Sequence, residues 1–256
     1  MVLVDLFLWL ITYSFLGWAY ESVLRSVLKK RLVNSGFLTG PICPIYGFGA
    51  LSVILVLYQR VDNIALIFLF SMILTSAIEY ITAVLLEKLF HAKWLDYSKL
   101  RFNFQGRVSL VGTIVFGALS VLLIKFVHPF VSGHIHAVSD RVQIGIAGII
   151  FITLLFDVYM NVRSLVHLNV RLAEIQTAFN SFLEQYSKKS DELKTALFEK
   201  FEESEFYNER IKKLFRLNRL HGRRLALAYP KFTHLKYDDV WQRLKTILLD
   251  AAKKEK

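Results

Sequence analysis

Three carboxylate side chains lie within or at the end of long apolar segments, where an acid needs a special reason to be. Glu21, Glu79 and Asp157 each share one face with small or polar residues at four-residue steps, provided that the segments are helical. Insertion scales put an acid at the centre of a bilayer at about 2.5–3.5 kcal/mol, so intramembrane acids mark substrate or ion sites. Glu79 is the deepest of the three. The spacing predicts a polar membrane site centred on Glu79.

Each of these acids also has a structural interpretation. Glu21 precedes Arg25 by four residues, which is the spacing of an ion pair on one helix face. Asp157 lies near the end of its segment and can be a boundary residue. For Glu79, whose neighbours are apolar, the alternative is a structural pair with Arg107 or with a tyrosine hydroxyl. The sequence alone leaves these alternatives open.

The segment 34–49 is too apolar for a solvated loop and too broken for a plain helix. It contains four glycines and two prolines and almost no charge. Irregular backbone at membrane depth is tolerated only where protein or a water-filled cavity surrounds it. The segment therefore indicates a functional site rather than a simple connecting loop.

A second unusual loop, 93–107, combines aromatic and hydrogen-bonding residues. Its aromatic side chains suit the membrane interface, so the loop can also be a simple anchor. We expect this loop and the segment 34–49 to meet on the cytoplasmic side and to form one substrate site. The candidate substrate-binding residues are Glu21, Asn34, Tyr46, Glu79, Asp96, Tyr97, Asn103 and Arg107.

Five apolar segments meet or approach the roughly 20 residues that a membrane span requires. They cover residues 3–24, 42–59, 63–86, 108–128 and 143–161. Lys and Arg concentrate in the first and third loops, which places these loops in the cytoplasm and the N-terminus outside. The predicted fold class is all-α: a polytopic, five-span membrane domain over 1–161 and a cytoplasmic helical tail over 162–256.

The tail carries an apolar seam at coiled-coil spacing. Its members are Leu165, Leu168, Leu172, Ile175, Phe179, Phe182 and Tyr186. We expect one helix to continue from the fifth span to about Ser187, a break at 188–191, a second helix to about Tyr229, and a short amphipathic helix around Trp241. The seam must pack on a second copy of the chain or on the stretch 211–225 folded back as a hairpin.

Several of these residues resemble a family of bacterial integral membrane proteins named as ABC-transporter type IV permeases. The resemblance covers about residues 10–160, with a looser likeness at 223–230. The matching motifs are Gly17-Trp18-x-x-Glu21-Ser22, the run from Asn34 to Gly47, the Glu of the third span, Trp94-Leu95-Asp96-Tyr97-Ser98, Asn103 and Gly106-Arg107. Leu95 stands where the family usually has Trp. The resemblance implies a membrane protein of the transport class with no established substrate.

Other features bear on cofactors and partners. The sequence has no P-loop motif, so an ATPase would be a separate chain. His134 and His136 lack nearby cysteines, and we expect neither a metal nor a cofactor. Cys43 is the only cysteine, which excludes an intrachain disulfide. The basic stretch 210–224 suits anionic lipid better than nucleic acid, because a tail tethered to a bilayer meets lipid first. Whether the seam holds two or more copies of the chain together as a homo-oligomer is left open.

Three functional classes fit these observations. The first is a multi-pass permease or transporter subunit of the plasma membrane, and we rank it first. The second is a membrane-embedded enzyme that acts at the inner leaflet, because carboxylate, Tyr, Asn and Arg side chains converge at one level. The third is a membrane-anchored scaffold that acts through its helical tail. Whether any reaction is catalysed, and which substrate moves in which direction, is left open.

Overall fold

The chain folds into two compact units in a computed structural model that describes residues 2–30, 32–93, 96–98, 100–186, 200–201, 203 and 233–254. The first unit comprises Met1–Leu89 and Trp94–Asn161, and the second comprises Phe90–Lys93 and Val162–Lys256. The division after Asn161 coincides with the predicted end of the membrane domain. The assignment of the two units to membrane and cytoplasm stays a prediction.

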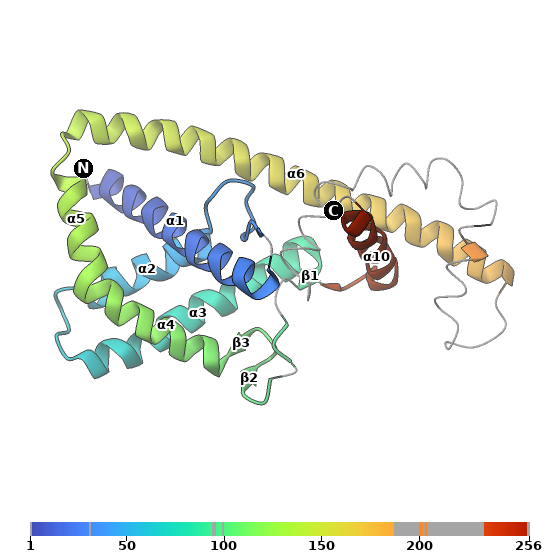
Figure 1. The fold of residues 1–256 in the computed structure, drawn as a ribbon, viewed down its shortest axis with the longest axis horizontal. Helices are drawn as coiled ribbons and strands as arrows, with labels where there is room; N and C mark the ends of the chain where they lie inside the picture. The colour runs from blue at the N-terminus through green and yellow to red at the C-terminus, as the bar shows by residue number, and fades with distance from the viewer. Residues whose placement is uncertain are drawn as a thin grey trace. The chain divides into compact units, whose positions relative to one another are not determined.

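Helices dominate the part of the chain that the structure describes (Figure 1). Four stretches there are long and apolar enough to cross a membrane: Val2–Leu28, Ile64–Phe90, Leu110–His136 and Asp140–Phe182. The helices are α1 (Val2–Lys29), α2 (Pro44–Leu57), α3 (Ile64–Phe90), α4 (Leu110–Leu122), α5 (His128–His136), α6 (Asp140–Tyr186) and α10 (Asp238–Lys254). The prediction of a helical membrane protein is confirmed.

The helix α2 is shorter than the span expected over 42–59. It has 14 residues and begins at Pro44, and the residues before it are not helical. At 1.5 Å per residue its length is about 21 Å, against a hydrocarbon core of about 30 Å. Proline is common at the first helical position, because an N–H at that position has no acceptor within the helix. The count of five spans stays a prediction.

The fourth apolar segment continues as helix well beyond residue 128. Leu110–His136 is one helical stretch in which a π-helical turn, η1 (Leu123–Val127), joins α4 to α5. The turn ends two residues before Pro129, which has no N–H for the ladder, and local changes of helical register are the usual response to such a residue. His134 and His136, which follow the predicted span of 108–128, lie in the last turn of α5.

Two glycines allow α1 and α2 to pack closely. A Cβ atom at Gly47 would lie 2.2 Å from the Ser14 Oγ and 2.5 Å from the Leu10 carbonyl oxygen, and one at Gly17 would overlap the side chain of Tyr46. The sequence analysis placed both residues in family-like motifs without assigning them this role. Their absent side chains bring the two helices together beside the segment 34–43.

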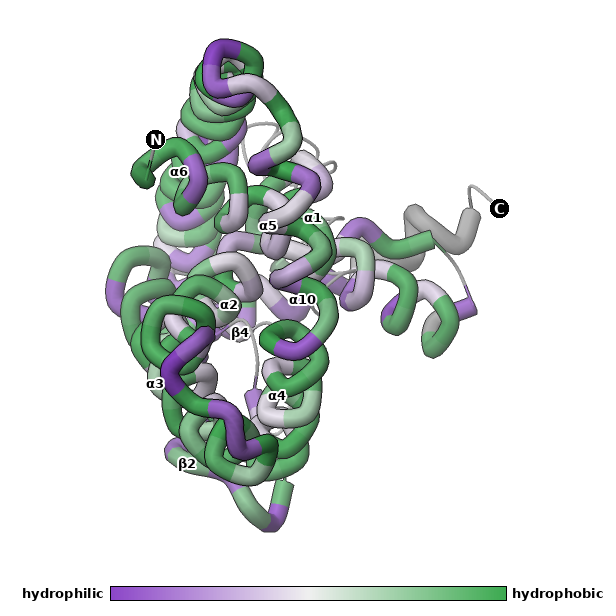
Figure 2. Tube along the Cα trace, turned by 90° about the vertical axis from the view of Figure 1, so that its left-hand side faces the viewer, coloured by the Kyte–Doolittle hydropathy of each residue, from purple (hydrophilic) through white to green (hydrophobic). Residues whose placement is uncertain are grey.

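The outer faces of the first unit are apolar. In Figure 2, α3 and α4 are green along most of their length. Large side chains on these helices are exposed, among them Ile73 at 66% and Val111 at 68%. A helix that is hydrophobic all round is typical of a membrane span, because the bilayer covers the face that water would otherwise meet.

In the second unit, the seam of α6 is buried within the chain itself. Leu165, Leu168, Leu172, Ile175, Phe179 and Phe182 are all at most 5% exposed. The ring of Phe201 lies 5.4 Å from that of Phe179 and 5.6 Å from that of Phe182, so part of the tail returns over the seam. The stretch 211–225, the helix expected to Tyr229 and the basic stretch 210–224 lie outside the described residues. The choice between hairpin and dimer therefore stays a prediction.

A small antiparallel sheet joins the end of α3 to the C-terminal part of the chain. Strand β1 (Ala92–Lys93) pairs with β4 (Thr233–His234), and the Leu235 N–H donates to the His91 carbonyl oxygen at 2.7 Å. The helix α10 follows directly, and its Val240, Trp241 and Leu244 are fully buried. The sequence predicted the apolar face of this helix, but not the sheet.

His234 is held in the neutral form by its partners. Its Nε2 lies 3.0 Å from the Asn169 Oδ1, and Asn169 in turn donates to the Phe90 carbonyl oxygen. Its Nδ1 accepts the Tyr237 N–H at 3.1 Å, which assigns the hydrogen to Nε2. Burial, reinforced by His91, lowers the pKa of His234 from 6.5 to about 4.

Gly47→Ala should destabilise the first unit by about 1–3 kcal/mol, because the new methyl group meets a backbone carbonyl that cannot move freely. Thermal unfolding of the full-length protein in detergent measures the change. Gly49→Ala is the matched control on the same helix, since no atom lies within 4 Å of the added Cβ. Equal melting temperatures for the two variants would contradict the close α1–α2 packing.

The second unit should lose stability as the pH falls from 6.5 towards 4. In that pH window His234 is protonated in the unfolded chain but stays neutral in the folded chain. The free energy of unfolding therefore decreases by up to about 3 kcal/mol and then levels off. Hydrogen exchange of the amides of 233–244, corrected for the intrinsic pH dependence of exchange, measures the effect. His234→Gln keeps an N–H donor without a titrating ring and should flatten the profile; an unchanged profile would assign the effect to another group.

Candidate functional site

A cavity of about 660 Å³ lies among α1, α2, α3 and α4 of the first unit. Four of the eight predicted site residues line it: Glu21, Tyr46, Glu79 and Tyr97. They come from three helices and from the loop after α3. Further polar lining residues are Tyr13, Tyr20, Arg25, Thr75 and Ser120. The cavity thus brings together half of the candidate set and adds residues that the sequence analysis did not select.

Glu21 forms the ion pair that its spacing predicts. The Arg25 Nη2 lies 2.5 Å from the Glu21 Oε1, and the Arg25 Nε donates to the same oxygen at 2.8 Å. The second carboxylate oxygen, Oε2, accepts a weak hydrogen bond from the Cys43 thiol at 3.8 Å. Glu21 therefore neutralises one cation of the cavity wall and holds the end of the segment 34–43.

Glu79 is buried, with 7% of its surface exposed, and it does not pair with Arg107. Its carboxylate has a hydrogen bond with the Tyr97 side chain, as the tyrosine alternative anticipated. Burial raises the pKa of the Tyr97 phenol above its usual range, and the nearby Glu79 adds to the rise, so the hydroxyl is the donor at neutral pH. Among the described residues, the Glu79 Oε2 has no hydrogen-bond partner.

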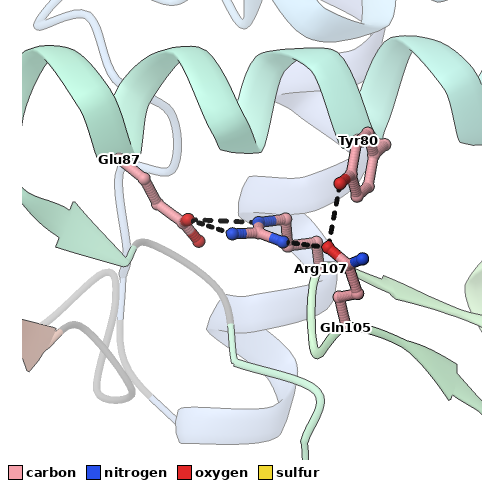
Figure 3. Close-up of polar contacts among 4 residues, drawn as sticks. All are labelled: Tyr80, Glu87, Gln105 and Arg107. Atoms are coloured by element: carbon pink, nitrogen blue, oxygen red, sulfur yellow. Dashed lines mark hydrogen bonds and ion pairs between the residues drawn. The ribbon is translucent and has the colours of Figure 1, made fainter.

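Arg107 binds a different acid of α3 (Figure 3). Its Nη2 lies 2.7 Å from the Glu87 Oε2, and its guanidinium stands over the ring of Tyr80 at 5.4 Å. The Gln105 Oε1 accepts from both Arg107 and the Tyr80 hydroxyl. The hydrogen bond that Arg107 donates to Glu87 also raises the pKa of Arg107. Arg107 anchors the loop after α3 to that helix and is not among the cavity-lining residues.

The remaining residues of this loop shape its backbone. Strands β2 (Asn103–Phe104) and β3 (Val108–Ser109) form a hairpin, which the sequence analysis did not expect. Asn103 spans its turn, donating to the Leu100 carbonyl oxygen and accepting from the Gly106 N–H. Gly106 has a φ of +70°, a left-handed conformation that suits glycine. Asp96 accepts the Ser98 N–H at 3.0 Å.

The segment 34–43 forms several hydrogen bonds with residues of α1. The Trp18 Nε1 donates to the Asn34 side chain at 2.7 Å, and Asn34 in turn donates to the Thr39 carbonyl oxygen. The Ser22 Oγ accepts the Ser35 N–H, and the Ser14 carbonyl oxygen accepts the Cys43 N–H at 3.0 Å. Asn34 therefore fastens the segment and is not among the cavity-lining residues.

A second set of partners comes from α6. The Asp157 carboxylate accepts the Thr39 N–H at 3.3 Å and the Gly40 N–H at 3.0 Å. Asn161 donates to the Asp157 Oδ1 and accepts from the Thr39 hydroxyl at 3.1 Å. Asp157 is thus more than a boundary residue. One sequence signal could have indicated this role. Asp157 and Asn161 are an Asp-x-x-x-Asn pair in an apolar helix, and the irregular segment 34–43 needs hydrogen-bond acceptors for its amides.

Sequence reasoning also missed a buried histidine. His128 is 1% exposed, and the Tyr13 hydroxyl lies 2.7 Å from its Nδ1. The rings of Trp9 and Tyr58 pack edge-on at 4.8 and 4.5 Å. Because Tyr13 also lines the cavity, this group supports part of the cavity wall. No cluster of three or more His, Cys, Asp or Glu side chains suited to a metal ion occurs within the described ranges.

Asp157→Ala should release the segment 34–43 and expose the only thiol of the chain. Cys43 is 5% exposed, so its reaction with a small maleimide reports local opening. Loss of charge-assisted hydrogen bonds to two amides should raise the labelling rate at least about tenfold, because each such bond contributes about 1.5–3 kcal/mol. The control is Asp62→Ala, which removes an exposed acid. Equal rates in the two variants would show that α1 alone holds the segment.

Comparison with known families agrees with this architecture. A family model described as "Putative ABC-transporter type IV" matches residues 8–162. Comparisons with curated proteins and with solved structures gave no match. The matched region is more than half of the chain. It includes α1 from residue 8 onwards, α2 to α5, the segment 34–43 and the part of α6 that carries Asp157 and Asn161. The chain therefore belongs to this ABC-transporter-like family of multi-pass membrane proteins.

Proposed function

We propose that the chain is the permease component of a transporter and that its substrate binds in the cavity at Glu21, Tyr46, Glu79 and Tyr97. The observation that carries the proposal is a cavity among four apolar helices with a buried carboxylate at one end. Asn34, Asp96, Asn103 and Arg107 support the site from outside by fixing the two irregular segments. With the predicted topology, the polar end faces the cytoplasm, and the protein lies in the plasma membrane.

The irregular backbone beside the cavity favours transport. Substrate sites of transporters commonly lie where a helix is interrupted, because unwound backbone can change partners without unfolding the helices. Here the segment 34–43 precedes the short α2, and side chains of α1 and α6 satisfy several of its amides. These bonds can be exchanged singly, whereas helix-ladder bonds cannot. The segment meets the cavity wall at Glu21 through the Cys43 thiol, so a change of its partners would act on the cavity there.

The energy source is assigned to a second protein. The chain has no phosphate-binding loop, and membership of an ABC-transporter-like family supports a separate ATPase as partner. We propose the predicted cytoplasmic tail as the part that such a partner contacts, and anionic lipid as a further contact of its basic stretch 210–224. An ATPase that copurifies with the tagged full-length chain would support the separate partner. Its loss on removal of residues 162–256 would support the tail as its contact.

Glu79→Gln should abolish transport while the protein stays inserted and folded, because the amide keeps the shape of the side chain but removes its charge. Inverted membrane vesicles from cells that encode the chain, deleted for it and complemented with wild type or variant, provide the assay. After ATP is added, mass spectrometry compares solutes inside the vesicles. Wild type should accumulate or lose at least one compound that Glu79→Gln leaves unchanged.

Asp62→Asn is the matched control, since it removes an exposed acid outside the cavity, and it should behave as wild type. Full activity of Glu79→Gln would remove the centre of the proposed site. A compound that is chemically converted rather than moved would support the membrane-embedded enzyme instead. Wild-type vesicles that match deleted ones in every solute would favour a scaffold that acts through its tail.

A further inference from the structure

The cavity has two chemically different parts. Around Glu79 it is lined by the ionic and phenolic side chains described above. The rest of its lining is mostly hydrocarbon from α1, α4 and η1, and some of it lies directly beside the ionic residues, as Leu24 does beside Arg25. These apolar lining residues are Leu16, Leu24, Leu28, Val115, Phe116, Leu119, Leu122, Leu123 and Val127. A ligand that fills such a space needs a polar head and an apolar body.

Some apolar residues that line the cavity are also exposed at the surface of the helices. Leu24 of α1 and Leu122 of α4 both line the cavity, yet they remain 44% and 48% exposed. Other exposed side chains of α1 and α4, among them Val23 and Val111, are apolar as well, so hydrocarbon would surround these lining residues. A molecule dissolved in the bilayer can therefore reach the cavity without crossing water.

Among its lining residues the cavity has one acid more than it has cations. Arg25 is neutralised by Glu21 at hydrogen-bond distance. Glu79 receives a hydrogen bond from the neutral Tyr97 and has no ion pair with any described residue. Its Oε2 is buried without a partner within the described ranges, and such an oxygen is destabilising unless a ligand supplies a donor. The described lining therefore leaves one carboxyl group without a cationic partner.

Tyrosine rings accompany this carboxylate. Tyr20, Tyr46 and Tyr97 all line the polar end, and the rings of Tyr20 and Tyr46 meet edge-on with centroids 6.4 Å apart. Aromatic faces attract ammonium groups, and the attraction grows when water is excluded. A carboxylate with several tyrosines is the side-chain set that an organic cation prefers. An anionic head would meet Glu79 instead, and would have to displace Glu21 from Arg25.

We infer that the cavity binds a cationic amphiphile, whose amine head donates to Glu79 beside the tyrosines and whose hydrocarbon chain lies between α1 and α4. This inference rests on the proposed function, because it names the chemical class of the substrate. The volume of about 660 Å³ is within the roughly 300–1,000 Å³ of small-molecule sites and suits a single-chain molecule. The amine enters from the bilayer with its chain and needs no aqueous path.

Photolabelling of the full-length protein in lipid nanodiscs tests the inference. The probes are dodecylamine, dodecyl sulfate and dodecanol, each with the same photoreactive diazirine in the chain, and mass spectrometry locates the adducts. The amine should label the α1 and α4 walls at least about tenfold more than the sulfate and the alcohol, which corresponds to one charge-assisted hydrogen bond. Glu79→Gln should lower amine labelling to the level of the alcohol, and Asp62→Asn should not.

The alcohol probe shows whether Glu79→Gln keeps an intact cavity, because its labelling should be the same in variant and wild type. Equal labelling by all three probes in the wild type, stronger labelling by the sulfate, or amine labelling that survives Glu79→Gln would each overturn the inference. ATP-dependent solute movement in vesicles without amine labelling would leave the permease proposal standing and remove this ligand class. Amine labelling without any solute movement would leave this ligand class standing and remove the permease proposal.

Discussion

The architecture of the first unit depends on one requirement: the peptide groups of the segment 34–43 need partners in a place where water is scarce. Helices satisfy their own backbone, but this segment does not. Side chains and carbonyls of α1 accept some of its amides, and the Asp157 carboxylate of α6 accepts two more. The first and last helices of the unit are thereby held to one stretch of irregular chain, beside which the cavity forms.

Two acids of the unit illustrate how the surroundings decide the role of a carboxylate. Glu87 is partly buried and bound by a guanidinium that also stands over a tyrosine ring, so its charge is balanced and it fixes the loop after α3. Glu79 lies two helical turns earlier on the same helix, receives only a neutral hydrogen bond, and keeps one oxygen without a partner among the described residues. A balanced acid holds structure together, and an unbalanced one is available to a ligand.

Features that depend on local composition were predictable from the sequence. Apolar length identified the long helices, and four-residue spacing identified the Glu21–Arg25 pair. The length of α2 was not predictable, because hydropathy records apolar side chains and not where the backbone becomes helical. The role of Asp157 depends on amides 117 and 118 residues away, and no local pattern encodes such a contact. The two small sheets were missed for the same reason, since two-residue strands carry no periodicity.

The short sheet between β1 and β4 has a mechanical consequence. The chain leaves the first unit after Leu89, returns to it at Trp94, and leaves it again after Asn161 within α6. Because β1 follows α3 after one residue and pairs with β4, backbone hydrogen bonds fix the C-terminal part of the chain to the end of the helix that carries Glu79. A pull on the C-terminal residues therefore acts on two places of the chain, α6 and the residues that follow α3.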